Sequence, residues 1–296
     1  LCHSTKFLSS LFSERTTNNT QHIFSFKEFS EILNSYFLRC PKNRFDDLIY
    51  PLMSNTDYTR TFLDLPYIKE EVMSLYKKDF HHELNVLRKR AGDRFTVFDG
   101  KGNSALAEIL DIDKKILKIL IIENYPVSNR HGIQINLGQS LIKNDPFNLT
   151  IQKATELGVG NFSPLLTERV TVNRANVNLE KRIEKWNQIA KGACEQCGEN
   201  WIPEITKPLK IEDWSRLINS DTKIVLYPDA EIMLSEIEIK DSISIAIGPE
   251  GDFTEEEIRG LKEDGFIPVT IGPRILRAET AAISVISALR YGAKEF

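Results

Sequence analysis

The sequence is poor in cysteine and contains no long apolar run. No window approaches the ~20 consecutive apolar residues that a membrane-spanning helix needs, so we expect no membrane partner. The first residues also lack the basic stretch and apolar core of a secretory signal peptide. Four cysteines in 296 residues are too few for a disulfide scaffold, which favours a reducing cytoplasm. These cysteines are Cys2, Cys40, Cys194 and Cys197.

A clustered set of metal ligands is also missing. Cys194 and Cys197 have Cys-x-x-Cys spacing, but a zinc site needs a second cysteine pair or histidines nearby in the sequence. A redox motif of this type follows a strand and begins a helix. This pair ends a predicted helix instead, so we predict neither a metal site nor a redox function.

The first 52 residues contain no glycine and no methionine. They are rich in Phe and Ser and show no clear hydrophobic period. The first methionine is Met53, and a chain beginning there would have 296 − 53 + 1 = 244 residues. We therefore expect residues 1–52 to be an extension outside the working protein, either from an upstream reading frame or from another domain.

Positive charge is not in excess over the whole chain, because the formal net charge is −4. It is concentrated locally between residues 77 and 94. A local patch is what meets RNA phosphates, although a solvated basic helix end would look the same in the sequence. The patch contains Lys77, Lys78, Arg88, Lys89, Arg90 and Arg94, against Asp79, Glu83 and Asp93.

Residues 60–125 predict a small β-rich unit. Residues 94–98 alternate in polarity, and Asp99-Gly100-Lys101-Gly102-Asn103 has the glycines of a hairpin turn. Residues 105–110 and 116–123 are further strand candidates, and residues 82–90 have helical spacing. A stretch rich in Pro, Ser, Asn and Gly at 124–132 predicts a linker.

Beyond the linker, short apolar strands alternate with amphipathic helices. This order predicts a mainly parallel sheet covered by helices on both faces. We expect strands at 133–137, 162–166, 223–227, 242–247 and 268–271, and helices at 147–157, 179–196, 255–263 and 278–291.

Two strand-to-helix turns carry the strongest functional signal. Gly248-Pro249-Glu250-Gly251 follows a strand, and Thr254 and Glu257 form a predicted capping box for the next helix. Glycine lets backbone groups approach a ligand closely. Three glutamates at the helix start disfavour a phosphate and favour a neutral or cationic ligand. A purely structural turn is the open alternative.

The second turn is the loop from Ile271 to Arg277. Two arginines flank two apolar residues in a loop, where apolar side chains are costly unless something covers them. An adenine-like ring would fit such a loop. The alternative is a loop packed into the core with its arginines in salt bridges.

Several phrases also occur in a fixed order along the chain. With them, from about Arg60 to its end, the chain resembles the RsmE family of the SPOUT superfamily. The phrases are Lys143, Gln152-Lys153-x-x-Glu156-Leu157-Gly158-Val159, Glu195-Gln196, Gly248-Pro249-Glu250-Gly251 and Arg274-Ile275-Leu276-Arg277-Ala278-Glu279-Thr280-Ala281. The upstream Val86-Leu87-Arg88, Gly92-Asp93 and Phe98-Asp99-Gly100 match the family's N-terminal domain.

The resemblance implies an enzyme that methylates N3 of a uridine in 16S ribosomal RNA of the 30S subunit, with S-adenosylmethionine as cofactor. It implies an α/β fold in which a trefoil-knotted, mainly parallel SPOUT domain follows a small PUA-like β-barrel. The family's homodimer is implied as well. We accordingly place a PUA-like RNA-binding domain at 53–125 and a SPOUT methyltransferase domain at 130–296.

The resemblance also assigns roles to residues. Uracil N3 is a weak acid, so an arginine that stabilises its anion would assist methyl transfer. Arg274 and Arg277 are the catalytic candidates on this ground. The implied RNA-binding residues are Arg88, Lys89, Arg90, Lys143 and Lys153. The implied cofactor-binding residues are Tyr227, Gly248, Pro249, Glu250, Gly251, Ile271, Gly272, Ile275, Leu276, Arg277 and Ala278.

Three positions depart from the family pattern. Asp252 stands where the family has a second glycine, Glu199 stands where a basic residue is common, and Asn144-Asp145-Pro146 follows Lys143 where Gly and Lys are frequent. Two of these changes remove positive charge on the expected RNA side. They leave two alternatives open: a SPOUT methyltransferase with another RNA target, and an RNA-binding ribosome-assembly factor without catalysis.

Overall fold

The structure is a computed structural model of the 296-residue chain. It describes residues 59–64, 66–76, 89–113, 115–130, 132–170 and 179–295. All of these belong to the second of two units, Tyr58–Phe296. The expected extension at 1–52, most of the helix expected at 82–90, and Arg88 therefore lie outside the described residues. The boundaries 53–125 and 130–296 stay predictions.

The first sheet is formed by five strands within the described part of the chain, in the order β1-β3-β4-β5-β2. Neighbouring strands in this sheet pair antiparallel, except β1 and β3, which pair parallel. The predicted turn after β3 is confirmed, with positive φ angles of 74° at Gly100 and 99° at Gly102. The strands are β1 (Arg60–Phe62), β2 (Val72–Tyr76), β3 (Arg94–Phe98), β4 (Ser104–Ile112) and β5 (Ile116–Asn124).

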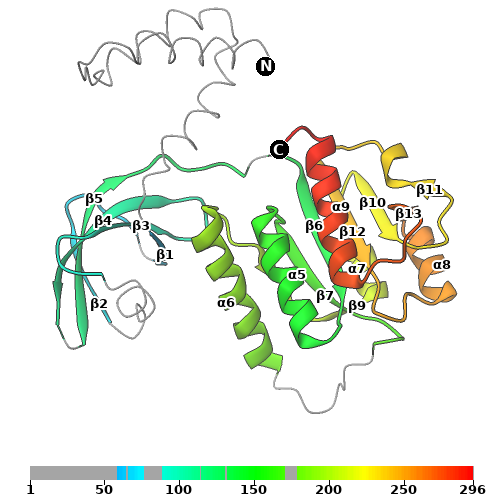
Figure 1. Cartoon of the computed structure of the whole chain (residues 1–296), viewed down its shortest axis with the longest axis horizontal. Helices are drawn as coiled ribbons and strands as arrows, with labels where there is room; N and C mark the ends of the chain where they lie inside the picture. Colours follow the sequence, from blue (N-terminus) through cyan, green and yellow to red (C-terminus); the bar gives the residue numbers. More distant parts are fainter. Residues whose placement is uncertain are drawn as a thin grey trace, which may run out of the picture. The chain divides into compact units, whose positions relative to one another are not determined.

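The second sheet is parallel throughout the part that the structure describes (Figure 1). Its order is β11-β13-β10-β12-β6-β7-β8, and β9 pairs with β7. The predicted mainly parallel sheet is thereby confirmed. The strands are β6 (Gln134–Ser140), β7 (Asn161–Leu166), β8 (Glu204–Ile205), β9 (Leu209–Lys210), β10 (Thr222–Leu226), β11 (Ile232–Met233), β12 (Ser242–Ile247) and β13 (Ile267–Thr270).

Helices cover both faces of this sheet (Figure 1). Helices α5 (Asn144–Glu156), α6 (Leu179–Cys197) and α9 (Ala278–Gly292) share one core with it, and α7 (Ile211–Leu217) and α8 (Glu255–Glu263) share the other. A short 3-10 helix, η3 (Leu234–Glu236), precedes β12. Helix α5 begins three residues earlier than predicted. Proline 146 is tolerated there because N–H groups in the first helical turn have no intrahelical partner.

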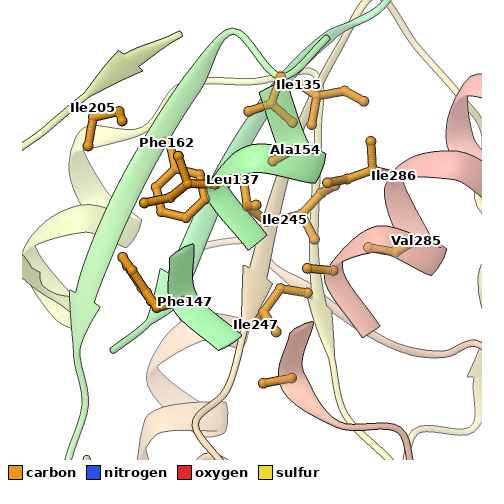
Figure 2. Close-up of a cluster of buried hydrophobic side chains, with 14 of the residues drawn as sticks. Ile135, Leu137, Phe147, Ala154, Phe162, Ile205, Ile245, Ile247, Val285 and Ile286 are labelled. Carbon is orange, nitrogen blue, oxygen red and sulfur yellow. The ribbon is translucent and has the colours of Figure 1, made fainter. Parts of the chain in front are cut away.

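Alternate residues of the central strands point to opposite cores. Ile245 of β12 lies in the core shared with α5 and α9, whereas its neighbour Ala246 lies in the core shared with α7 and α8. Figure 2 shows the first core, where Phe147 of α5 packs edge-on against Phe162 of β7 at 5.6 Å between ring centroids. Burial on both faces explains why these strands are continuous apolar runs in the sequence.

The strand order creates a switch point beside β6. From β6 the chain continues to β7 on one side and later returns to place β12 on the other. The carboxyl ends of β6 and β12 therefore meet where connections leave in opposite directions. Open α/β sheets bind ligands at such points.

Among the described residues, no helix is both long and apolar enough to cross a membrane.

Candidate functional site

The first strand-end turn follows β12. Gly248 and Pro249 are buried, and the amide of Asp252 donates to the Pro249 carbonyl at 3.0 Å. A Cβ at Gly248 would lie 3.1 Å from Oδ1 of Asp252 and 3.3 Å from the backbone nitrogen of Phe253. These contacts are tighter than ordinary van der Waals contact, so a larger residue at 248 would require its neighbours to shift by a few tenths of an ångström.

Asp252 adopts the backbone conformation that explains why the family has glycine at its position. Its φ is 60°, in the left-handed region that Asp and Asn tolerate better than other side chains. Its Oδ1 accepts a hydrogen bond from the Phe253 amide at 2.8 Å. Burial raises the pKa of the Asp252 carboxyl above its ordinary value. The aspartate thus keeps the turn closed at the cost of backbone strain.

Residues after β7 hold this turn from the side. Nη1 of Arg169 donates to the carbonyls of Gly251 at 2.8 Å and Phe253 at 3.4 Å. The buried carboxylate of Glu257 accepts from the amides of Glu168 and Thr254, both at 2.8 Å. The predicted capping box is confirmed, because Thr254 Oγ1 also accepts from the Glu257 amide at 3.2 Å. The sequence had given no sign of Arg169.

Two buried polar atoms next to the turn lack a hydrogen-bond partner within the described residues. They are Oε1 of Gln139 and Oγ of Ser140, at the carboxyl end of β6. Nε2 of Gln139 donates to the Ser140 carbonyl at 3.2 Å and lies 3.5 Å from the Gly248 carbonyl. Buried polar groups are normally paired. Orphan atoms beside a glycine turn fit a site whose hydrogen bonds a polar cofactor completes.

The second strand-end turn follows β13. Gly272 has a φ of 136°, and its carbonyl accepts a hydrogen bond from Oγ1 of Thr270 at 3.2 Å. Ile275 is 88% exposed, and Arg274 and Arg277 are exposed at the entrance to α9. The alternative of a loop packed into the core is therefore wrong for Ile275. Its apolar side chain is available to a ligand or to a second subunit.

The structure brings the predicted cofactor residues to one edge of the sheet. Tyr227 directly follows β10, and its amide donates to the Val269 carbonyl of β13 at 3.0 Å. Strand β10 lies between β12 and β13, so Tyr227 and the two turns end three adjacent strands. The predicted cofactor-binding residues are Tyr227, Gly248, Pro249, Glu250, Gly251, Ile271, Gly272, Ile275, Leu276, Arg277 and Ala278.

The predicted RNA-binding lysines lie in different environments. Lys143 is exposed at the start of α5, and its amide lies 3.5 Å from Oε1 of Glu250 in the first turn. Lys153, further along α5, is ion-paired with Glu156 at 2.8 Å. Lys89 donates to the Arg94 carbonyl at 3.0 Å, and Arg90 is exposed. Of these residues, Lys143 is the one that contacts the first turn, at the sheet edge where the predicted cofactor-binding residues lie, which we call the cofactor edge.

Glu199 has a structural role in the turn after α6. Its Oε1 accepts from the amides of Asn200 at 2.7 Å and Trp201 at 3.0 Å. A carboxylate that accepts from two successive amides stabilises the turn locally.

Burial raises the pKa of the nearby Cys194 thiol, which makes this thiol a poor nucleophile. In the described part of the chain, no cluster of three or more potential metal ligands was found.

Comparison with known proteins matches both halves of the described chain. An RNA methyltransferase domain model matches residues 129–290, and an RNA methyltransferase PUA domain model matches residues 75–122. Ribosomal RNA small subunit methyltransferase E of Buchnera aphidicola subsp. Schizaphis graminum is 36% identical over 235 residues, covering 79% of this chain and 94% of that protein. This chain belongs to the ribosomal RNA small subunit methyltransferase E family.

Two further members of the family are similar to this chain over most of their length. The Bacillus subtilis protein of that name is 30% identical, over 74% of this chain and 89% of its own length. The Neisseria gonorrhoeae enzyme, solved with bound S-adenosyl methionine, is 31% identical with a TM-score of 0.73, over 79% of this chain and 97% of that one. The α/β fold with a PUA domain and the family resemblance are thereby confirmed. The knot and the closed barrel stay predictions.

Proposed function

We propose that this chain methylates N3 of a uridine in 16S ribosomal RNA, using S-adenosylmethionine and acting on the 30S subunit. One observation carries the proposal beyond the family match. Two glycine-containing turns and Tyr227 end three adjacent parallel strands, beside orphan polar atoms of Gln139 and Ser140. That arrangement builds a ligand site largely from backbone groups at the place where α/β sheets bind ligands.

Methyl transfer needs positioning more than acid–base machinery. The cofactor supplies an electrophilic methyl group, and the two turns would hold it in line with the attacking nitrogen. Arg274 and Arg277 are exposed at the start of α9 and form no ion pair with another described residue. One guanidinium directed at the uracil would stabilise the N3 anion electrostatically.

A homodimer is part of the proposal. Large apolar side chains are exposed near both ends of α9: Ile275, at 88%, precedes it and Tyr291, at 77%, lies in its last turn. A second subunit would remove these two apolar side chains from water, which is favourable in proportion to the area covered. A second subunit packed along α9 would cover them and would also border the cofactor edge, because α9 begins directly after the second turn.

RNA contact by the first sheet is also proposed. Lys89 and Arg90 precede β3 in the domain that matches the RNA methyltransferase PUA domain. Basic side chains there would bind phosphates, with an affinity that falls as the salt concentration is raised.

Location of the protein in the cytoplasm stays a prediction. The domain ranges 53–125 and 130–296 agree with the two sheets and are proposed on that basis.

Two measurements on the purified chain test the function. Calorimetric titration with S-adenosylmethionine should show binding at or below millimolar ligand. Transfer of a labelled methyl group to 30S subunits that lack the modification should yield 3-methyluridine in 16S RNA. Binding of the cofactor without methyl transfer would favour the assembly-factor alternative, and a methylated base other than N3-uridine would show another target. No cofactor binding would refute the proposal.

A further inference from the structure

A cleft of about 790 Å³ lies between α5 and α6, next to β1. Four side-chain amides line it, and none of them is hydrogen-bonded to another described residue. Gln152, Gln188 and Gln196 are exposed and Asn148 is half-buried. Each amide offers both donors and an acceptor. Four unpaired amides around one cleft provide a polar surface that can read hydrogen-bonding edges.

The charges around the cleft do not favour a phosphate. Asp145 and Glu195 contribute carboxylates, and Arg60 contributes the cation. Nη2 of Arg60 is already engaged, because it donates to Oδ1 of Asn200 at 2.5 Å and to the Glu199 carbonyl at 3.4 Å, whereas the buried Nε has no partner within the described residues. A nucleotide would therefore enter with its uncharged part, the base, and leave its phosphate in solvent.

The cleft also has room and apolar surface for a flat ring. Leu149 and Ile189 present aliphatic side chains to it, and Gly192 of α6 lies between the polar residues. A Cβ at Gly192 would meet no atom within 4 Å. Glycine inside a helix is destabilising by roughly 0.5–1 kcal/mol relative to alanine. Close approach of a ligand to the helix backbone gives this glycine a reason to be there.

The cleft begins beside the cofactor edge. Asp145 is the first residue of α5 that lines the cleft, and it is two residues after Lys143. The amide of Lys143 lies 3.5 Å from Oε1 of Glu250 in the first turn. From Lys143 to Gln152 helix α5 rises roughly 14 Å, at about 1.5 Å per residue. A base bound along this stretch would be close in the RNA to a uridine held at the cofactor.

We propose that the cleft between α5 and α6 receives an unpaired base of the RNA substrate, a different base from the uridine that is methylated. The proposal rests on the proposed function and adds a second point of recognition to it. Proteins read RNA sequence mainly on unpaired bases, through hydrogen bonds to their edges. Among the residues that the structure describes, no aromatic side chain lines the cleft, so hydrogen bonds and the aliphatic side chains would provide the recognition.

Blocking the cleft with Gly192→Leu tests the proposal. The new side chain enters open space next to Leu149 and Ile189, and leucine is a better helix former than glycine, so the fold should be kept. The matched control is Gly260→Leu in α8, another helical glycine with nothing within 4 Å and outside this cleft. Urea unfolding checks both variants.

With 30S subunits lacking the methyl group as substrate, Gly192→Leu should raise KM about tenfold. That factor corresponds to the loss of about two neutral hydrogen bonds. The kcat, the S-adenosylmethionine affinity and the Gly260→Leu control should stay unchanged. The double variant Gln152→Ala, Gln188→Ala should raise KM in the same way. Unchanged KM in both cleft variants overturns the proposal.

Two further readouts separate the possible failures. Filter binding to the same 30S subunits reports the cleft's role even if the unaltered chain does not methylate them, in which case the proposed function alone fails. Sedimentation reports subunit association. If Gly192→Leu dissociates a dimer, the cleft is covered by a second copy of the chain and the proposal of a base site is wrong.

Discussion

Asp252 shows how a single residue can satisfy a glycine position at a cost. Its φ of 60° is a conformation that most side chains disfavour, and partial burial raises the pKa of its carboxyl. The hydrogen bond that its Oδ1 accepts from the Phe253 amide, at 2.8 Å, offsets part of the cost of this conformation. The departure from the family pattern is therefore compatible with an intact turn after β12, the turn predicted to bind the cofactor.

Replacing Asp252 with Asn should stabilise the protein at neutral pH. Burial disfavours the ionised carboxyl of Asp252, so its pKa is higher in the folded than in the unfolded chain. The protonated carboxyl therefore favours the folded state below the ordinary pKa of 3.8, and this contribution to stability is lost as pH rises through the raised folded pKa. Asparagine cannot ionise, keeps an acceptor oxygen and tolerates a positive φ. The urea midpoint of Asp252→Asn should exceed that of the unaltered chain at pH 7.5, and the difference should shrink towards pH 4. Equal midpoints at pH 7.5 would contradict this.

Arg274 and Arg277 should be separable by kinetics. We expect Arg274→Ala or Arg277→Ala to lower the single-turnover methylation rate of 30S subunits at least about tenfold, a barrier change of ~1.4 kcal/mol, because one guanidinium faces the base. For Arg274→Ala the affinity for S-adenosylmethionine should not fall in parallel; Arg277 is also a predicted cofactor-binding residue, so the rate of Arg277→Ala is compared at saturating S-adenosylmethionine. Arg259→Ala, on the exposed side of α8, is the control. Full rates in both loop variants would show that neither arginine is catalytic.

At the scale of elements, the start of α8 is linked to the end of β7 by one carboxylate. The two oxygens of Glu257 accept from different amides, those of Glu168 and Thr254, and Arg169 adds contacts to Gly251 and Phe253. The turn after β12, which is predicted to bind the cofactor, lies between these contacts. Its shape therefore depends on an element that is about 80 residues away in the sequence.

Glu257→Gln should weaken this link. Glutamine has one acceptor oxygen, so one of the two amides loses its partner, at a cost of about 1–3 kcal/mol for a buried donor. The free energy of unfolding should fall by that order, and S-adenosylmethionine should bind more weakly. Glu256→Gln is the matched control, since its exposed pair with Arg259 should contribute under about 0.5 kcal/mol. Equal stability of the two variants would show that the Glu168 contact is unimportant.

At the scale of the whole molecule, the two sheets and their helices are contained in residues 60–292. We predict that a shortened chain beginning at Met53 folds, dimerises and methylates 30S subunits like the full chain. Sedimentation, urea unfolding and methyl transfer measured side by side check this. An insoluble or inactive shortened chain would show that the first 52 residues contribute to the working protein.

The sequence by itself determined the order and type of the main elements. Strand β12 and helix α8 were predicted at their observed bounds, and the helix predicted to end at residue 157 ends at Glu156, with Gly158 just beyond it at a φ of 77°. These features depend on local signals: apolar runs, a Thr-x-x-Glu cap and glycine at positive φ. The sequence also located the two strand-to-helix turns after β12 and β13, because each is a short phrase that joins a strand to a helix; their role in binding the cofactor stays a prediction.

Only the tertiary structure decided what surrounds those turns. It placed β12 beside β6, brought Arg169 and Gln139 to the first turn, and buried Arg290 where its guanidinium donates to the carbonyls of Leu157 at 3.0 Å and Gly158 at 2.6 Å. It also formed the cleft between α5 and α6. Such contacts join residues many tens of positions apart, and their geometry is set by the packing of whole strands and helices, which local periodicity does not encode.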